Sequence, residues 1–306
     1  MHSPHIKIGT RKSPLALIQA QLVQKGLLDS HPTLTDQMIT IEPLITKGDK
    51  FKERPLSEIG GKGLFCKEID RKLLAGDVDI AVHSAKDMEA ILPPELVIAA
   101  VLKRADPRDV FLSTCASTLD DLPYGATVGT SSLRRKMQLL RHRPDIKIVN
   151  FRGNVTTRLA KLEEGVALAT ILARAGLERL GLTSEITYTF PVTQMLPAVG
   201  QGTISILVRA NDEKMKELLA PLNHPETHRC LLAERAFLKV LGANCHMPIA
   251  GYATCEDKEI YLRGLVAEEK PPFALAQGEA RGDDPEELGT RLGQELRKKL
   301  GHDIRG

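Results

Sequence analysis

The chain has 306 residues, which is enough for two or three domains with sizeable cores. Its composition is ordinary for a soluble globular protein, with 42% hydrophobic and 26% charged residues. The net charge is only +3, so any anion-binding site must come from where the charges sit and not from their sum.

Cysteine usage and hydropathy indicate the cellular compartment of the protein. The cysteines are odd in number, scattered and without a CxxC pair, namely Cys66, Cys115, Cys230, Cys245 and Cys255. This pattern favours reduced thiols and argues against disulfides. The N-terminus lacks a signal-peptide pattern, and the longest purely apolar stretch, 96–102, is far shorter than the roughly 20 residues of a membrane span. We expect a soluble, cytoplasmic protein that does not enter a membrane.

The first two thirds of the chain alternates strand-like and helix-like segments. Strands are predicted at 5–10, 38–46, 78–84, 96–102, 109–113, 126–130, 146–151 and 166–172, and helices at 13–28, 64–76, 131–143 and 154–165. Ser13 is a suitable N-cap for the first helix and Pro14 suits its first turn. The Gly-rich, charged stretch 46–63 is not periodic and is typical of a long functional lid or of disorder. Alternation of this kind favours parallel sheets with helices on their faces.

After the motif LPAVGQG (196–202) the pattern changes. One more strand is predicted at 203–209, followed by helices at 212–222 and 225–241. Three strand-like runs joined by turns come next, and a last helix at 284–301 ends the pattern. The order indicates a separate α+β domain from about residue 222 onward.

Three predicted helices begin in the same way. A strand ends, a small polar turn follows, and an arginine lies beside the helix start, in IGTRKSPLA (8–16), VGTSSLRRK (128–136) and FRGNVTTRL (151–159). The first-turn N–H groups of a helix attract anions, and arginine adds a two-pronged donor for carboxylate or phosphate. One such turn would be an ordinary surface; three at the ends of strands favour a cleft for a polyanion.

Other motifs leave alternatives open. Asp87, with Lys86 and His83, follows an apolar strand in AVHSAKD and is either an acid–base group or half of a solvent salt bridge. His224, His228, Cys230, Cys245 and His246 match no zinc spacing, so we expect no metal. Nucleic acid is not expected, because no basic tract or aromatic interleaving occurs. The turn cysteine Cys245 could be a nucleophile, a metal ligand, half of a disulfide or filler.

Eight motifs together resemble one family. RKSPLAL, GGKGLF, VHSAKD, DPRD, GTSSLRR, RGNVTTRL, LPAVGQG and NCHMPIA occur in the order found in porphobilinogen deaminases, also called hydroxymethylbilane synthases. The resemblance spans about residues 6 to 300. It implies an α/β fold of three domains, two of them periplasmic-binding-protein-like lobes with mixed, mainly parallel sheets. The implied domains are 1–102 plus 201–220, then 103–200, and a smaller α+β domain at 221–306.

The resemblance also implies a reaction. Proteins of this family join four porphobilinogen units head to tail with loss of ammonia, and release hydroxymethylbilane by hydrolysis. Growth starts on a dipyrromethane cofactor held by a thioether to a cysteine, which here is Cys245. Asp87 matches the catalytic aspartate. The small molecule porphobilinogen is the implied partner of a monomeric enzyme.

The implied binding residues match the motifs position by position. Those matching ligands of the substrate and cofactor carboxylates are Arg11, Ser13, Lys86, Ser131, Ser132, Arg134, Arg135, Arg152, Arg158 and Arg179. Gln201 matches a glutamine of the cleft, and Lys62 and Phe65 match the base of the lid.

Several positions depart from the family pattern. Ala243 and Asn244 precede the cysteine where Gly-Gly or Gly-Ser is usual, and His246 and Met247 follow it. Departures elsewhere are Ala85, Glu89, Phe151, Leu168 and Leu207. None replaces a residue with an implied direct role. They leave a second interpretation, a divergent, inactive or non-enzymatic carboxylate-binding protein on the same scaffold.

Overall fold

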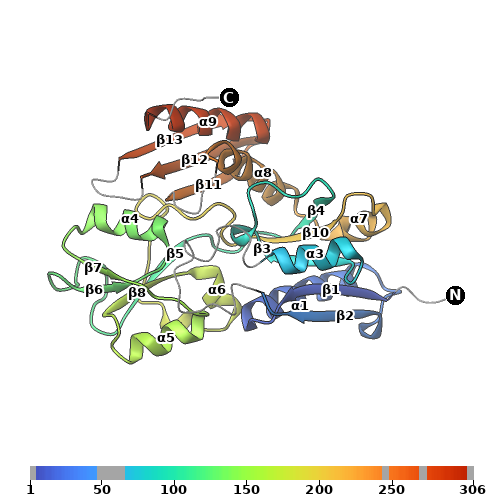
Figure 1. Ribbon diagram of the computed structural model, residues 1–306, viewed down its shortest axis with the longest axis horizontal. Helices are drawn as coiled ribbons and strands as arrows, with labels where there is room; N and C mark the ends of the chain where they lie inside the picture. The colour runs from blue at the N-terminus through green and yellow to red at the C-terminus, as the bar shows by residue number, and fades with distance from the viewer. Residues whose placement is uncertain (1–4, 47–65, 243–247, 269–273, 302–306) are drawn as a thin grey trace.

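The computed structural model describes residues 5–46, 66–242, 248–268 and 274–301. Each of its three units is built on a separate β-sheet (Figure 1). The two five-stranded units lie side by side, and the three-stranded unit lies against both of them (Figure 1).

The first sheet has the strand order β2-β1-β3-β10-β4. Its strands are β1 (Ile6–Arg11), β2 (Ile39–Leu44), β3 (Ile80–Ser84), β4 (Leu96–Val101) and β10 (Ile204–Arg209). β1 is parallel to β2 and β3, whereas β10 is antiparallel to both β3 and β4. Four strands therefore run one way and β10 runs against them. The helices of this unit are α1 (Pro14–Ser30), α3 (Lys67–Ala75) and α7 (Glu213–Leu219).

The second sheet repeats this plan, with the order β7-β6-β8-β5-β9. Its strands are β5 (Asp109–Ser113), β6 (Thr127–Gly129), β7 (Lys147–Val149), β8 (Ala169–Ala173) and β9 (Tyr188–Thr189). β6 is parallel to β7 and β8, and β5 is antiparallel to β8 and β9. Its helices are α4 (Leu133–His142), α5 (Val155–Glu163) and α6 (Arg174–Arg179).

The chain crosses between the two sheets twice. It leaves the first sheet after β4 and enters the second as β5, and it returns from β9 to β10. The reversed strand of each sheet is therefore the one that directly follows a crossing. Gly200 and Gly202 lie on the return crossing with φ angles of 72° and 86°. A Cβ at Gly202 would lie 2.5 Å from the carbonyl oxygen of Ala105, so the two crossing segments are in contact there.

The third unit is a three-stranded antiparallel sheet, β11 (Ile249–Glu256), β12 (Glu259–Ala267) and β13 (Leu275–Gly282). Helices α8 (Pro225–Val240) and α9 (Pro285–Lys299) pack against it. Phe237 of α8 is fully buried, and its ring occupies the space where a Cβ at Gly264 of β12 would lie. Alternating apolar residues of the strands thus meet one apolar face of each helix, which is the usual basis of an α+β core.

A buried carboxylate joins the third unit to both crossings. Glu234 of α8 is completely buried and accepts hydrogen bonds from the backbone N–H of Gly200 (2.6 Å) and of Ala253 (2.8 Å). It also forms an ion pair with Arg104, whose Nε donates to the carbonyl of Gln201 at 2.9 Å. Arg104 and Gly200 belong to different crossings, so one side chain holds both of them to α8.

The predicted fold class is confirmed. The sheets are mixed and mainly parallel in strand direction, and the C-terminal unit is α+β. The strands and helices predicted from sequence all occur, with ends shifted by up to three residues. Ser13 caps α1 by accepting from the Ala16 N–H, as predicted. The structure adds α6, β9 and short 3₁₀ turns, whose brevity gives no periodic signal. The residue boundaries proposed for the three domains remain a prediction. In the described part of the chain, no helix has the length and apolar character needed to cross a membrane.

Candidate active site

Within each five-stranded sheet, the predicted site residues follow strands that run in the same direction. Arg11 ends β1, Asp87 ends a 3₁₀ turn (Ala85–Asp87) after β3, and Ser131 and Ser132 follow β6. Arg152 follows β7, and Arg179 ends α6 just after β8. Parallel strands bring such turns to one edge of each sheet, and the paired crossings bring the two edges together.

Asp87 has one contact to its side chain and one to its backbone. One of its carboxylate oxygens lies 3.9 Å from a terminal nitrogen of Arg11, and about a third of its side chain is exposed. The thiol of Cys66 donates to the Asp87 carbonyl oxygen at 3.3 Å. The carboxylate is therefore accessible while its backbone is fixed.

Lys86, next to Asp87, is exposed and has several charged side chains around it. Its Nζ donates to Oε1 of Gln201 at 3.4 Å. Loss of hydration among the surrounding protein atoms, together with the positive charge of Arg135, lowers the pKa of Lys86 to about 8. Asp87 and Asp109 oppose this shift. A carboxylate ligand would favour the charged form again.

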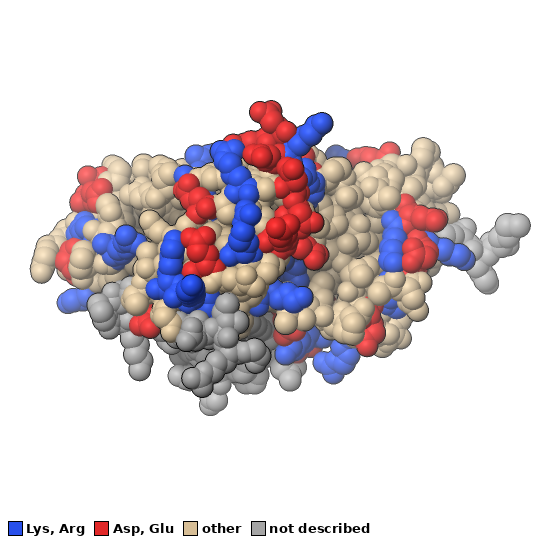
Figure 2. Space-filling model, turned by 90° about the horizontal axis from the view of Figure 1, so that it is seen from above, with Lys and Arg blue, Asp and Glu red and all other residues tan. Residues whose placement is uncertain are grey.

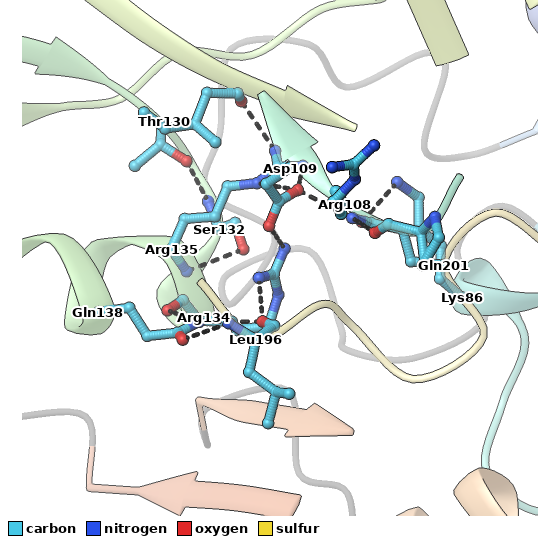
Figure 3. Close-up of polar contacts among 12 residues, drawn as sticks. Lys86, Arg108, Asp109, Thr130, Ser132, Arg134, Arg135, Gln138, Leu196 and Gln201 are labelled. Carbon is cyan, nitrogen blue, oxygen red and sulfur yellow. Dashed lines mark hydrogen bonds and ion pairs between the residues drawn. The ribbon is translucent and has the colours of Figure 1, made fainter. Parts of the chain in front are cut away.

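A buried carboxylate that the sequence reasoning did not assign lies beside this lysine. Asp109 begins β5 and is completely buried. Its two oxygens lie 2.7 Å from Arg134 and 2.7 Å from Arg135, and Gln201 donates to it at 2.9 Å (Figure 3). Burial alone would raise the pKa of Asp109, but the two guanidinium charges and the hydrogen bonds outweigh it, so the pKa lies below its usual range.

Arg134 and Arg135 therefore already have a protein carboxylate as partner. Arg134 also donates to the Leu196 carbonyl at 2.6 Å, and Arg135 donates to the Ile171 carbonyl at 2.9 Å. Both are buried, which lowers the pKa of Arg134 although Asp109 opposes the shift. The motif DPRD was the available signal for Asp109, but nothing local in it shows which arginines it meets.

The remaining arginines form a second group with their positive charges close together. Arg158 is half-buried and its Nε donates to the Gly153 carbonyl at 2.9 Å. Burial, then the charges of Arg135 and Arg152, lower the pKa of Arg158 to about 10, while Asp87 opposes this. Burial likewise lowers the pKa of Arg152. The charge of Arg158 therefore interacts with those of Arg135, Arg152 and Asp87.

The remaining predicted residues that the structure describes make hydrogen bonds near the start of α4 or lie at the return crossing. Ser132 caps α4 by accepting from the Arg135 N–H, and Ser131 accepts from the Phe151 N–H at 3.0 Å. Arg179 donates to the Gly202 carbonyl at 2.7 Å, and burial lowers its pKa. Gln201 lies between the two left-handed glycines and is 1% exposed. Lys62, Phe65 and Cys245 lie outside the described residues.

The histidines considered as metal ligands have structural partners. His224 caps α8 by accepting from the Thr227 N–H, and His228 lies 2.9 Å from Asn223 Oδ1. Buried His83 lies 2.9 Å from Asp70; burial would lower its pKa, but Cys66 and Asp70 raise it to about 10. Within the part of the chain that the structure describes, no three His, Cys, Asp or Glu residues are grouped so as to hold a metal ion.

Comparison with known proteins decides the family. The family model described as "Porphobilinogen deaminase, dipyromethane cofactor binding domain" matches residues 6–217, and "Porphobilinogen deaminase, C-terminal domain" matches residues 228–298. The chain is 49% identical over 302 residues to "Porphobilinogen deaminase, chloroplastic" of Pisum sativum, covering 97% of this chain and 82% of that protein. The chain belongs to the porphobilinogen deaminase family. It is therefore an enzyme of tetrapyrrole biosynthesis, a transferase, as the motifs predicted.

Two solved structures show a looser likeness to this chain. The periplasmic VFT2 domain of Bordetella pertussis BvgS has a TM-score of 0.43 at 16% identity, over 72% of this chain and 87% of that one. A nutrient binding protein of Burkholderia cenocepacia, bound to methionine, has a TM-score of 0.44 at 17% identity, over 72% of this chain and 93% of that one.

Proposed function

We propose that this enzyme joins four porphobilinogen units head to tail on a dipyrromethane primer attached to Cys245, and then releases hydroxymethylbilane by hydrolysis. Each pyrrole unit carries two carboxylates and loses ammonia as it is joined. The site must therefore hold many negative charges and also favour positive charge at the reacting carbon.

The observation that carries the proposal is the gathering of like charges around one carboxylate. Arg11, Lys86 and Arg158 lie close enough to Asp87 for their charges to interact with it, and Arg158 also interacts with Arg135 and Arg152. Burial lowers the pKa of both Arg152 and Arg158. Bringing cations together in a partly dehydrated place is unfavourable unless an anion offsets it. This donor set fits a ligand with several carboxylates, as substrate and primer both are.

Asp87 is suited to the reacting end of the substrate. Its exposed carboxylate can accept hydrogen bonds from pyrrole N–H groups and stabilise the positive charge that develops as ammonia leaves. Arg11, at 3.9 Å, places a positive charge beside that carboxylate. The hydrogen bond from Cys66 to the Asp87 backbone fixes the turn that carries it.

Asp109 orients the deeper arginines for the same task. A guanidinium has five N–H donors. Asp109 and the Ile171 carbonyl engage Nε, Nη1 and Nη2 of Arg135. Two N–H groups of Arg135 then remain for a substrate or primer carboxylate, in a direction that Asp109 sets. Lys86, Ser13, Ser131, Ser132, Arg134, Arg179 and Gln201 complete the proposed binding residues, with Lys62 and Phe65 at the lid.

The primer, when bound, supplies the free pyrrole position from which the chain grows. The family model that matches residues 6–217 is that of a dipyrromethane-binding domain. Attachment through Cys245 follows from its match to the family's cofactor cysteine.

The deciding experiment is a mass measurement paired with an assay. Protein made in a host that synthesises porphobilinogen should exceed its calculated mass by two linked pyrroles, on the tryptic peptide 240–258 that contains Cys245. It should also consume porphobilinogen. An unmodified Cys245 together with no consumption would show that the scaffold has lost its chemistry.

The proposal extends to the molecule's partners. We expect a monomer that binds porphobilinogen and neither nucleic acid nor membrane; on the face shown in Figure 2, basic and acidic side chains are interspersed. Light scattering of the purified protein tests the oligomeric state. The cytoplasm is the proposed compartment, although the similar pea protein is named chloroplastic, and imaging of the tagged full-length protein tests it.

A further inference from the structure

Two thiols of the C-terminal unit are almost in bonding contact. Sγ of Cys230, in α8, lies 3.4 Å from Sγ of Cys255, in β11. A disulfide needs about 2.0 Å between the sulfurs, so they must approach by roughly 1.4 Å, which small side-chain rotations can supply. We propose that Cys230 and Cys255 form a reversible disulfide that ties α8 to β11.

The surrounding contacts hold the two elements in this arrangement. Arg229, next to Cys230, donates to the carbonyls of Lys258 and Asp283, both at 2.9 Å. Lys258 lies in the two-residue turn between β11 and β12, three residues after Cys255. Sγ of Cys255 also lies 3.7 Å from the Glu226 carbonyl, one helical turn before Cys230. The end of the β11–β12 hairpin is thus fixed against the first turns of α8, and the sulfurs remain close without a bond between them.

The two thiols differ in accessibility, which sets the order of reaction. Cys230 is 5% exposed and packs in the core of this unit, whereas Cys255 is half-buried. Burial, followed by the hydrogen bond with Cys255, raises the pKa of Cys230. Cys255 is therefore the sulfur that meets a soluble reagent, and Cys230 is the one that completes the bond.

The oxidant is a low-molecular-weight disulfide, such as glutathione disulfide. The Cys255 thiolate attacks one sulfur of glutathione disulfide and releases one glutathione thiolate. Cys230 then loses its proton and attacks Sγ of Cys255, releasing the second glutathione. In total, two protein thiols are oxidised to one disulfide and one glutathione disulfide is reduced to two glutathiones.

The position of the bond bears on Cys245. Cys245 lies between Cys230 and Cys255 along the chain, so three pairings are available to an oxidant while Cys245 is an unmodified thiol. A bond between Cys230 and Cys255 satisfies both neighbouring thiols and leaves Cys245 to its own chemistry. This inference rests on the geometry of the two sulfurs and does not depend on the proposed reaction.

The test equilibrates the full-length protein in glutathione buffers of graded redox ratio. The reaction is then quenched with acid, the protein is unfolded and the remaining thiols are alkylated, before digestion with trypsin. We expect peptide 230–235 joined to peptide 240–258, two hydrogens lighter than the pair, with fragment ions locating the bond on Cys255 and not on Cys245, and the joined peptide lost again when glutathione is in excess. The oxidised protein should have a melting temperature a few degrees higher.

Variants separate this pair from general thiol oxidation. Cys230→Ser should retain glutathione on Cys255, Cys255→Ser should leave Cys230 fully alkylated, and Cys115→Ser, which removes an exposed thiol, should still form the bond. Complete alkylation of Cys230 and Cys255 in the native protein in oxidising buffer would overturn the proposal. So would a bond that appears equally in denatured protein, or a bond from Cys245 to either partner in place of this one.

Discussion

One carboxylate oxygen of Asp109 accepts two hydrogen bonds from Arg135, from Nε at 3.2 Å and from Nη2 at 2.7 Å. The other oxygen of Asp109 faces Arg134. The fully buried carboxylate of Asp109 thus forms ion pairs with two buried guanidinium groups. It fixes the directions in which the remaining N–H groups of both arginines point.

Removing the negative charge of Asp109 should lower the stability of the fold. Asp109→Asn keeps the shape but leaves Arg134 and Arg135 buried without a counter-charge, and breaking a buried pair in this way costs about 3 kcal/mol or more. We expect a clearly lower midpoint of chemical unfolding, together with poor primer loading. Asp120→Asn, at an exposed carboxylate paired with His142, is the matched control and should change the midpoint little. Equal midpoints for the two variants would show that Asp109 does not hold the arginines.

Asp87 should be needed for turnover but not for folding or primer attachment. We predict that Asp87→Ala retains the primer by intact mass while kcat falls by about 100-fold or more, because stabilisation of developing positive charge is lost. Normal turnover would remove Asp87 from the catalytic role. Loss of the primer as well would assign it to binding instead.

The arginine group should act on binding. Arg152→Ala is predicted to block primer loading or chain growth, or to raise KM by about tenfold or more, because a charge-assisted hydrogen bond contributes about 1.5–3 kcal/mol. Arg141→Ala, on the exposed face of α4, is the control. Mass spectrometry and initial rates distinguish the two effects, and unchanged values for both would exclude Arg152 from the site.

Lys86 should give the enzyme an alkaline limit. With a pKa of about 8, Lys86 is mostly charged below that pH and mostly neutral above it, so its attraction for a carboxylate weakens as pH rises. We expect KM to be level up to about pH 8 and then to increase, by at most tenfold per unit. Lys86→Arg stays charged throughout and should remove this increase. The same rise in both proteins would assign the limit to another group.

The sequence predicted those features that depend on neighbouring residues. Ser13 and Pro14 specify the start of α1 locally, whereas the anion site predicted from the recurring turns with arginine stays a prediction. The role of Asp109 could not be predicted in this way, because Arg134 and Arg135 reach it only through the order of strands in the second sheet. The contact between Cys230 and Cys255 depends in the same way on how α8 packs against β11. The α6 helix was missed because six residues hold too few turns to show a period.

The hydrogen bonds of Glu234 have a mechanical consequence. Both connections between the lobes are attached to the same carboxylate, through Arg104 on one and the Gly200 N–H on the other. The helix that carries Glu234 leads directly into the segment containing Cys245. Any rotation of one five-stranded unit against the other is therefore constrained at one buried carboxylate, carried by the helix that precedes the proposed cofactor cysteine in the chain.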